Sequence, residues 1–247
     1  MRQPNFRGLR LGRDKTFWIV VGGLFLLYGI FRLGVVGLLT TVVALLVAIT
    51  VHECAHAWAA EQLGDPTARL MGRVSLNPLV HLDPMGTVMM AVTAVMGMGI
   101  GWGKPVPVSP HRLRFGSRLG NGIVALAGPV ANLITALALG LILRLTPGSL
   151  TGLAGVLVTI AFTNIVIAMF NLLPIPPLDG HSVLLGLLSL SRSRLAWQAS
   201  QFILAMRRQG PMVLIFVIVL TQLAGINLIG WLIGPPTRLL FRVIVGA

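Results

Sequence analysis

The sequence has few charged residues, and acidic residues are the scarcest of them. Charged residues make up 10% of its 247 residues, only six are acidic, and 55% are hydrophobic. Mean hydropathy is +0.90. This balance excludes a domain organised around one water-excluding core and is typical of a polytopic membrane protein. There is one cysteine, Cys54. No intrachain disulfide is therefore possible, and we assign this cysteine no role.

The shortage of acidic residues leaves a net charge of +13. Such a charge can indicate nucleic-acid binding. Here, however, the arginines lie between long apolar runs, where the positive-inside bias of membrane proteins places them. The sequence therefore predicts no nucleic-acid partner and a lipid bilayer as surroundings. It shows no short-period repeat and no low-complexity tract.

Charge and hydropathy divide the chain into four parts. Residues 1–15 predict a basic cytoplasmic tail, and residues 16–32 a first transmembrane helix. No small-residue cleavage site follows, so we expect this helix to be retained, with the amino terminus in the cytoplasm. Residues 33–185 form the predicted membrane core. Residues 186–247 are expected to hold a basic loop and a C-terminal transmembrane segment, in a multi-pass protein of the cell membrane.

The predicted fold is an all-α polytopic membrane protein with about five to six transmembrane helices. Beyond the first helix, the expected spans are residues 33–63, 120–143, 151–173 and 211–233.

Between the second and third of these helices, the pattern changes. Residues 67–76 alternate loosely and predict short strands with a turn at Gly72. Residues 86–101 are apolar but short and interrupted by glycine, so we expect a re-entrant or interfacial segment rather than a full span. Strands with open edges cannot face lipid. The sequence therefore predicts a small membrane-associated β-hairpin and re-entrant region.

A histidine pair lies inside the apolar run of the second span. His52 and His56 are four residues apart and share one face of a helix, where both imidazoles can bind one metal ion. Glu53 can then reach a water on that metal, which is the HExxH arrangement of zinc hydrolases. The alternative is two core histidines beside a snorkelling glutamate. Because each ionisable group at membrane depth needs a partner, we favour the functional interpretation.

Catalytic zinc sites commonly have a third protein ligand. Asp179 ranks first among the candidates, because it follows a proline-broken span that ends on the predicted cytoplasmic side. His81 and Asp83 follow. The other candidates are Glu61, Asp65, His111 and His181.

Three motifs resemble the site-2 protease family of intramembrane zinc metalloproteases. They are residues 52–56, Gly128–Asn132 with its Gly-Pro pair, and Asn171–Gly180, which is similar to the family pattern NxxPxPxLDG. The resemblance covers residues 35–185 and is closest to the compact prokaryotic branch, without an evident regulatory domain. It implies that His52, His56 and Asp179 bind one Zn²⁺ per chain and that Glu53 is the general base.

The resemblance also implies a membrane-embedded protein substrate. We expect Asn171 near the substrate backbone, although its side chain could instead form hydrogen bonds with backbone groups that the broken helix leaves unpaired. His81 could assist the oxyanion, line a water route or make an ordinary polar contact. A substrate helix must unwind before cleavage, and the predicted strands at 67–76 would offer an edge for it.

Two other functions remain open from the residues. A histidine pair and an aspartate at membrane depth also suit a membrane metal-ion transporter. A catalytically inactive binding relative would carry the same motifs. The oligomeric state is not indicated by the sequence.

Overall fold

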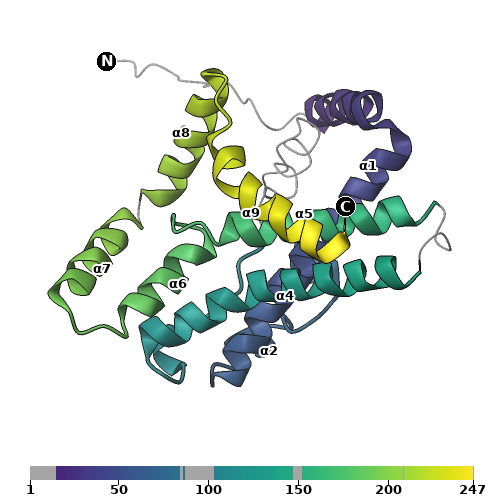
Figure 1. The fold of residues 1–247 in the computed structure, drawn as a ribbon. Coiled ribbons are helices and arrows are strands. Elements are labelled where there is room, and N and C mark those ends of the chain that lie inside the picture. The colour runs from purple at the N-terminus through teal and green to yellow at the C-terminus, as the bar shows by residue number, and fades with distance from the viewer. Residues whose placement is uncertain (1–14, 84–85, 87–102, 147–151, 208, 247) are drawn as a thin grey trace, which may run out of the picture.

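The computed structural model describes residues 15–83, 86, 103–146, 152–207 and 209–246, and its regular elements there are helical (Figure 1). The helices are α1 (Lys15–Gln62), α2 (Thr67–Leu70), η1 (Pro78–Val80), η2 (Pro110–Arg112), α4 (Ser117–Leu145), α5 (Ala154–Asn171), α6 (Asp179–Leu188), α7 (Arg194–Met206), α8 (Gly210–Leu223) and α9 (Leu228–Val245). One isolated bridge joins Leu82 to Gly103. The predicted all-α class is confirmed for the described part of the chain.

The first helix bends near the expected boundary between two spans. Helix α1 is interrupted at Gly34, which has a φ of 68° and a ψ of 166°. A residue without a Cβ adopts this backbone conformation at little cost. The sequence placed the boundary at residues 32 and 33, two positions earlier. Beyond the bend the helix carries the histidine pair and continues to Gln62.

Four helices in the described residues are long and apolar enough to cross a membrane. They are Leu27–Gln62, α4, α5 and α9. The predicted spans at 33–63, 120–143 and 151–173 correspond to the first three. The chain therefore has the helices of a multi-pass membrane protein.

The predicted last span, residues 211–233, is wrong. Helix α8 ends at Leu223 and α9 begins at Leu228. The side chain of Asn227 accepts a hydrogen bond from the backbone N–H of Gly230 at 2.8 Å and so caps α9. Hydropathy does not show this break, because apolar residues continue on both sides of it. The asparagine does show it, because asparagine is favoured at the N-cap, the position just before the first residue of a helix.

The predicted strands at residues 67–76 are also wrong. Thr67–Leu70 forms the single turn α2. The Asp65 carboxylate accepts hydrogen bonds from the backbone N–H and the hydroxyl of Thr67, which starts a new helical turn after α1 ends. The expected turn at Gly72 is present, with a φ of 71°. Of the predicted re-entrant segment, residues 87–101 lie outside the described residues.

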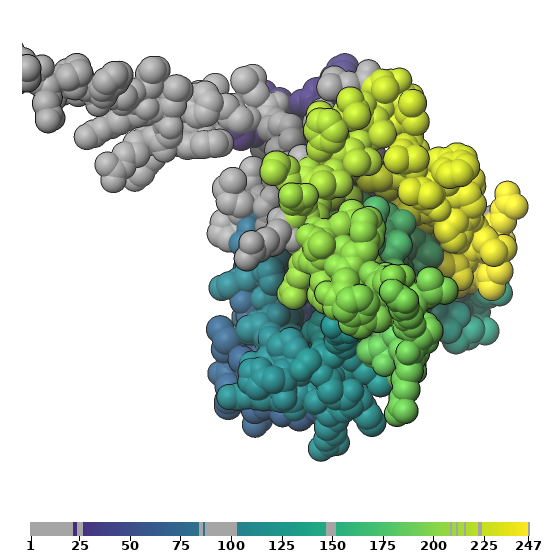
Figure 2. Space-filling view, turned by 90° about the vertical axis from the view of Figure 1, so that its left-hand side faces the viewer, coloured from purple at the N-terminus to yellow at the C-terminus, as the bar shows by residue number. Residues whose placement is uncertain are grey.

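Helix α4 is the centre of the bundle and packs against α1, α5 and α6. Its buried residues are mainly small, which lets the neighbouring helices approach closely. They are Gly120, Gly122, Val124, Ala125, Gly128, Pro129, Asn132, Ala136 and Gly140. Helix α9 crosses α4 and α5, whereas α7 and α8 lead away from α4 (Figure 1). Helix α8 still packs Leu214 and Ile218 against Phe170, near the end of α5, and against Leu178, just before α6. Figure 2 shows α7 and α8 in light green on the face above the teal N-terminal end of α4.

Candidate metal centre

Three side chains from two distant segments converge where α1, α4 and α6 meet. The Nε2 atoms of His52 and His56 lie 3.0 and 3.3 Å from Oδ2 of Asp179. The two imidazole rings have their centroids 4.5 Å apart and are nearly perpendicular, at 88°. Both histidines are buried, with exposed fractions of 6% and 7%. The structure thus brings together the histidine pair and the third ligand that the sequence ranked first.

The opposite ring nitrogen of each histidine is held by an acceptor. Nδ1 of His56 donates to the backbone carbonyl of Val124 at 2.7 Å. Nδ1 of His52 donates to Oδ1 of Asn132 at 2.6 Å. A carbonyl oxygen only accepts, so these contacts assign the ring hydrogen to Nδ1 in both histidines. Each Nε2 therefore presents a lone pair toward Asp179.

This arrangement fits a metal ion by its chemistry. Two imidazole lone pairs face a carboxylate oxygen that is buried and has no hydrogen-bond partner among the described residues. Such acceptors repel one another unless a cation lies between them. Two ligand atoms of a tetrahedral zinc site lie about 3.3 Å apart when each bond is about 2.0–2.1 Å long. The distances from the two histidines to Asp179 are close to that value.

Two glycines, which have no Cβ, provide the space that the three side chains need. A Cβ on Gly128 would lie 2.5 Å from Nε2 of His56 and 2.7 Å from Cε1 of His52. A Cβ on Gly180 would collide with the backbone carbonyls of Leu172 and Leu173, at the end of α5. The first glycine lets α4 pass directly beside the imidazoles. The second lets α6 begin close against α5, with Asp179 in its first turn.

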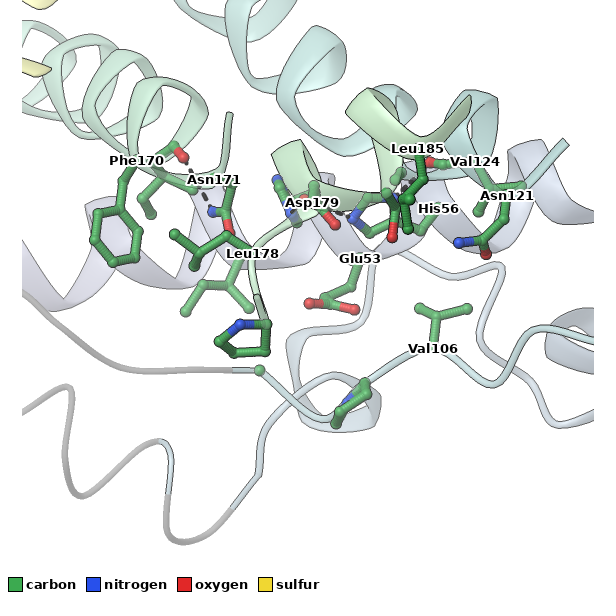
Figure 3. A pocket seen from close by; sticks show the side chains of 18 of the residues that line it. Glu53, His56, Val106, Asn121, Val124, Phe170, Asn171, Leu178, Asp179 and Leu185 are labelled. Atoms are coloured by element: carbon green, nitrogen blue, oxygen red, sulfur yellow. Dashed lines mark hydrogen bonds and ion pairs between the residues drawn. The ribbon is translucent and has the colours of Figure 1, made fainter. Parts of the chain in front are cut away.

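Glu53 points into a cavity of about 1210 Å³ beside the three ligand candidates (Figure 3). The backbone segment that contains Val106 crosses the other side of this cavity, and a Cβ on Gly103 would lie 3.1 Å from Oε1 of Glu53. Asn171 and Asn121 line the same cavity on opposite sides of Glu53 in this view. A carboxylate is thus present where water and an extended chain could meet the metal centre.

The other acidic ligand candidates have different partners. Glu61 pairs with Arg69 at 2.7 Å. Oδ1 of Asp83 accepts the backbone N–H of Gly86 at 2.8 Å. Oδ2 of Asp65 accepts the backbone N–H of Ser109 at 2.6 Å, which ties the end of α1 to the segment before η2. In the described residues, only His52, His56 and Asp179 form a group that could hold a metal ion.

The remaining histidines lie outside this group. Nδ1 of His181 donates to the backbone carbonyl of Leu178 at 2.7 Å. His111 is exposed, in the short helix η2. Neither contributes an atom to the group of three ligand candidates.

The two predicted substrate contacts differ in their surroundings. Asn171 lines the cavity, and its Nδ2 donates to the backbone carbonyl of Ile167 at 3.0 Å, while its oxygen has no hydrogen-bond partner in the described part of the chain. His81 is fully buried and does not line the cavity. Its Nε2 donates to the carbonyl of Ser75 at 2.7 Å, and its Nδ1 has no hydrogen-bond partner among the described residues. A substrate role of His81 stays a prediction.

Sequence reasoning gave no role to the asparagine that holds His52. Asn132 is fully buried in α4. The available signal was its presence as a polar residue in the middle of an apolar span. That signal does not identify its partner, because the contact to His52 joins residues 80 positions apart.

Comparison with known proteins gives a consistent set of matches. The family description "Peptidase family M50" matches residues 149–217. The chain is 40% identical over 152 residues to "Putative zinc metalloprotease YwhC" of Bacillus subtilis, covering 58% of this chain and 66% of that protein. It is 31% identical over 192 residues to "Putative zinc metalloprotease Rip2" of Mycobacterium tuberculosis, covering 76% of this chain and 68% of that protein.

A third relative, the Rip2 protein of Mycolicibacterium smegmatis, is 34% identical over 159 residues, covering 62% of this chain and 59% of that protein. The match therefore spans less than two thirds of the length of YwhC, at 66%, and of this Rip2, at 59%. No solved structure matches the chain significantly.

Proposed function

Since the chain belongs to peptidase family M50, the site-2 protease family, we propose that it is a zinc metalloprotease that cleaves membrane proteins. The peptide bond it hydrolyses would lie within or near a transmembrane segment. The observation that carries this proposal is the convergence of three metal-binding atoms beside Glu53, on the wall of a large cavity. Fold alone would not support an activity, whereas this set of side chains does.

In this proposal, His52, His56 and Asp179 hold one zinc ion per chain. Bound zinc supplies Lewis-acid polarisation and lowers the pKa of water to about 7. Glu53 takes a proton from the attacking water and returns it to the leaving amine. Val124 and Asn132 hold the imidazoles through Nδ1, so that both Nε2 atoms face the same point.

The cavity supports a peptide as the substrate. Its volume of about 1210 Å³ exceeds the range of about 300–1,000 Å³ typical of small-ligand pockets. Apolar side chains of α1 and α5, such as Leu45, Ile49 and Phe170, line it together with polar groups. Asn171 would hydrogen-bond the main chain of an unwound substrate segment through its amide.

The proposed setting is the cell membrane, with about five to six spans and the amino terminus in the cytoplasm. Two basic stretches support this orientation. The segment that leads into α4 and the first turn of α4 contain Arg112, Arg114 and Arg118, and the region around α7 contains Arg192 and Arg194. Both would then lie on the cytoplasmic side, near the end of the bundle that holds Asp179.

The activity can be tested with purified protein and a panel of transmembrane peptides. We expect zinc-dependent cleavage by the wild type and a loss of at least about 100-fold with Glu53→Gln, because general-base catalysis contributes about 10²–10⁴-fold. Zinc content should stay near one per chain in both proteins. The matched control is Glu61→Gln, on the same helix but paired with Arg69, which should retain cleavage.

The same experiment separates the two rival functions. A metal-ion transporter would move zinc across vesicle membranes and cleave no peptide. An inactive binding relative would bind a peptide without cleaving it in either the wild type or Glu53→Gln. Cleavage that persists in Glu53→Gln at the wild-type rate would contradict the proposed mechanism.

A further inference from the structure

The two histidines of the metal centre are oriented by different kinds of acceptor. His56 donates to a main-chain carbonyl, that of Val124. His52 donates to a side-chain amide oxygen, Oδ1 of Asn132, over the shorter distance of 2.6 Å. A backbone acceptor is fixed by the path of the helix. An amide side chain can rotate and can also present its nitrogen, so its orientation needs a cause of its own.

That cause lies in the two other contacts of Asn132. Its Nδ2 donates one hydrogen to the backbone carbonyl of Ala48 at 2.9 Å and the other to Oδ1 of Asn164 at 2.8 Å. The carbonyl of Ala48 only accepts, so the nitrogen of Asn132 must face it. The oxygen of Asn132 is thereby left for His52, and it can only accept the Nδ1 hydrogen.

Asn164 is fixed in the same way one step further from the metal. Its Nδ2 donates to the backbone carbonyl of Ile160, one turn earlier on α5, at 2.8 Å. Its oxygen therefore faces α4 and accepts from Asn132. Both asparagines are fully buried, with exposed fractions of 0%. Their hydrogen bonds form one directed chain from α5 through α4 to His52 on α1.

We infer that Asn132, oriented by Asn164, is a positioning residue that sets the tautomer and ring orientation of His52 for metal binding. The inference rests on the proposed function in one respect, that zinc is the ion held. Groups that hold the far nitrogen of a metal-binding histidine typically change metal affinity by about 10–100-fold when replaced. The chain uses three helices for this purpose, so the geometry of α1 against α4 and α5 is coupled to the metal centre.

A positioning role and a merely structural role for Asn132 predict different orders of zinc affinity among its variants. Both Asn132→Ala and Asn132→Asp lose the two donated hydrogen bonds. Asn132→Asp keeps an acceptor for His52 but buries a carboxylate in addition to that of Asp179, which destabilises the fold more than alanine does. If Asn132 positions His52, zinc affinity should fall in the order wild type, Asn132→Asp, Asn132→Ala. If Asn132 only stabilises the fold, zinc affinity should instead follow the thermal stability of the metal-free proteins, and Asn132→Asp should have the lowest affinity.

The test measures zinc affinity by chelator competition and thermal stability of the metal-free proteins, both on the full chain in detergent. We expect affinity about 10–100-fold weaker for Asn132→Ala. Asn164→Ala should have a smaller effect, and Asn132→Ala combined with Asn164→Ala should match Asn132→Ala alone, since the two act in series. Thr135→Val is the matched control, because this threonine bonds within α4, to the carbonyl of Ala131. Its affinity should equal that of the wild type.

Additive effects of the two alanine variants, or wild-type zinc affinity in Asn132→Ala, would overturn the inference. If Asn132→Ala does not fold, Asn164→Ala carries the test, since it leaves the contact to His52 in place. Failure of the proposed function looks different. In that case the wild type itself would bind no zinc or cleave no peptide, whatever the asparagine variants do.

Discussion

The junction of α1, α4 and α6 differs from the arm formed by α7 and α8 in how side chains are held. At the junction, buried polar groups have directed partners, and glycines allow direct contact between helices. On the arm, large side chains such as Trp197, Phe202 and Phe216 are 61%, 68% and 63% exposed. The comparison indicates that precise geometry is concentrated where the candidate ligand atoms meet, and that the exposed side chains of the arm tolerate change.

The largest expected effect is at the junction, from Gly128→Ala. The added methyl group would lie 2.5 Å from Nε2 of His56 and 2.7 Å from Cε1 of His52, so both imidazoles would have to move from the positions in which they face Asp179. We expect a loss of zinc affinity of at least about 100-fold, the upper end of what changes around metal ligands cost. Zinc content after dialysis against a chelator measures it.

The control for this change is Gly155→Ala on α5, whose added Cβ would have no neighbour within 4 Å. Alanine is favoured over glycine in a helix by about 1 kcal/mol, so this variant should keep its zinc and unfold at an equal or higher temperature. Equal zinc affinity in the two glycine variants would contradict the claim that the junction leaves no free space.

A medium effect is expected at the edge of the junction, from Asp65→Asn. Burial would raise the pKa of Asp65, but the hydrogen bonds from Ser109 and Thr67 outweigh it and hold the pKa below its ordinary value. A carboxylate with a lowered pKa stabilises the fold above its ordinary pKa of about 3.9, and this contribution is lost as pH falls through the lower folded value. The substitution should therefore destabilise the protein by about 1–3 kcal/mol at pH 7.

Thermal unfolding at several pH values measures this difference. The wild type should be more stable than Asp65→Asn from about pH 5 to 7, and the gap should narrow below about pH 4. A gap that widens as the solution becomes more acidic would show that the carboxylate form is not the stabilising one.

The smallest effect is expected on the arm, from Trp197→Ala and Phe202→Ala together. Both side chains are mostly exposed in α7. Exposed substitutions usually change stability by less than about 0.5 kcal/mol. In detergent, zinc content and the unfolding temperature should stay close to those of the wild type. A loss of zinc comparable to that of Gly128→Ala would remove the distinction between the two regions.

The sequence predicts the parts of this arrangement that follow from local spacing. The interval between His52 and His56 is enough to place both on one helical face. Asp179 could be ranked first because a proline-broken span brings the chain back toward the same side. By contrast, the contact between Asn132 and Asn164 depends on the rotation of α4 against α5, which hydropathy does not determine.

The two wrong predictions about the fold have local causes. The break at residues 224–227 lies within an apolar run, and it is marked by Gly225, which has a φ of 69°, and by the cap at Asn227. At residues 67–70, the loose alternation suggested a strand, but hydrogen bonds from Thr67 to Asp65 start a helical turn. In both cases one side chain that bonds to a nearby backbone N–H outweighs the hydrophobic pattern.

The central claim is that His52, His56 and Asp179 bind one zinc ion, and zinc-edge X-ray absorption with metal quantification tests it most directly. The account predicts one zinc per chain, with two imidazole nitrogens and a carboxylate oxygen at about 2.0–2.2 Å. It also predicts that Asp179→Asn loses most of the bound zinc after dialysis against a chelator. A wild type without bound zinc, or an Asp179→Asn variant with unchanged zinc content and spectrum, would contradict the claim.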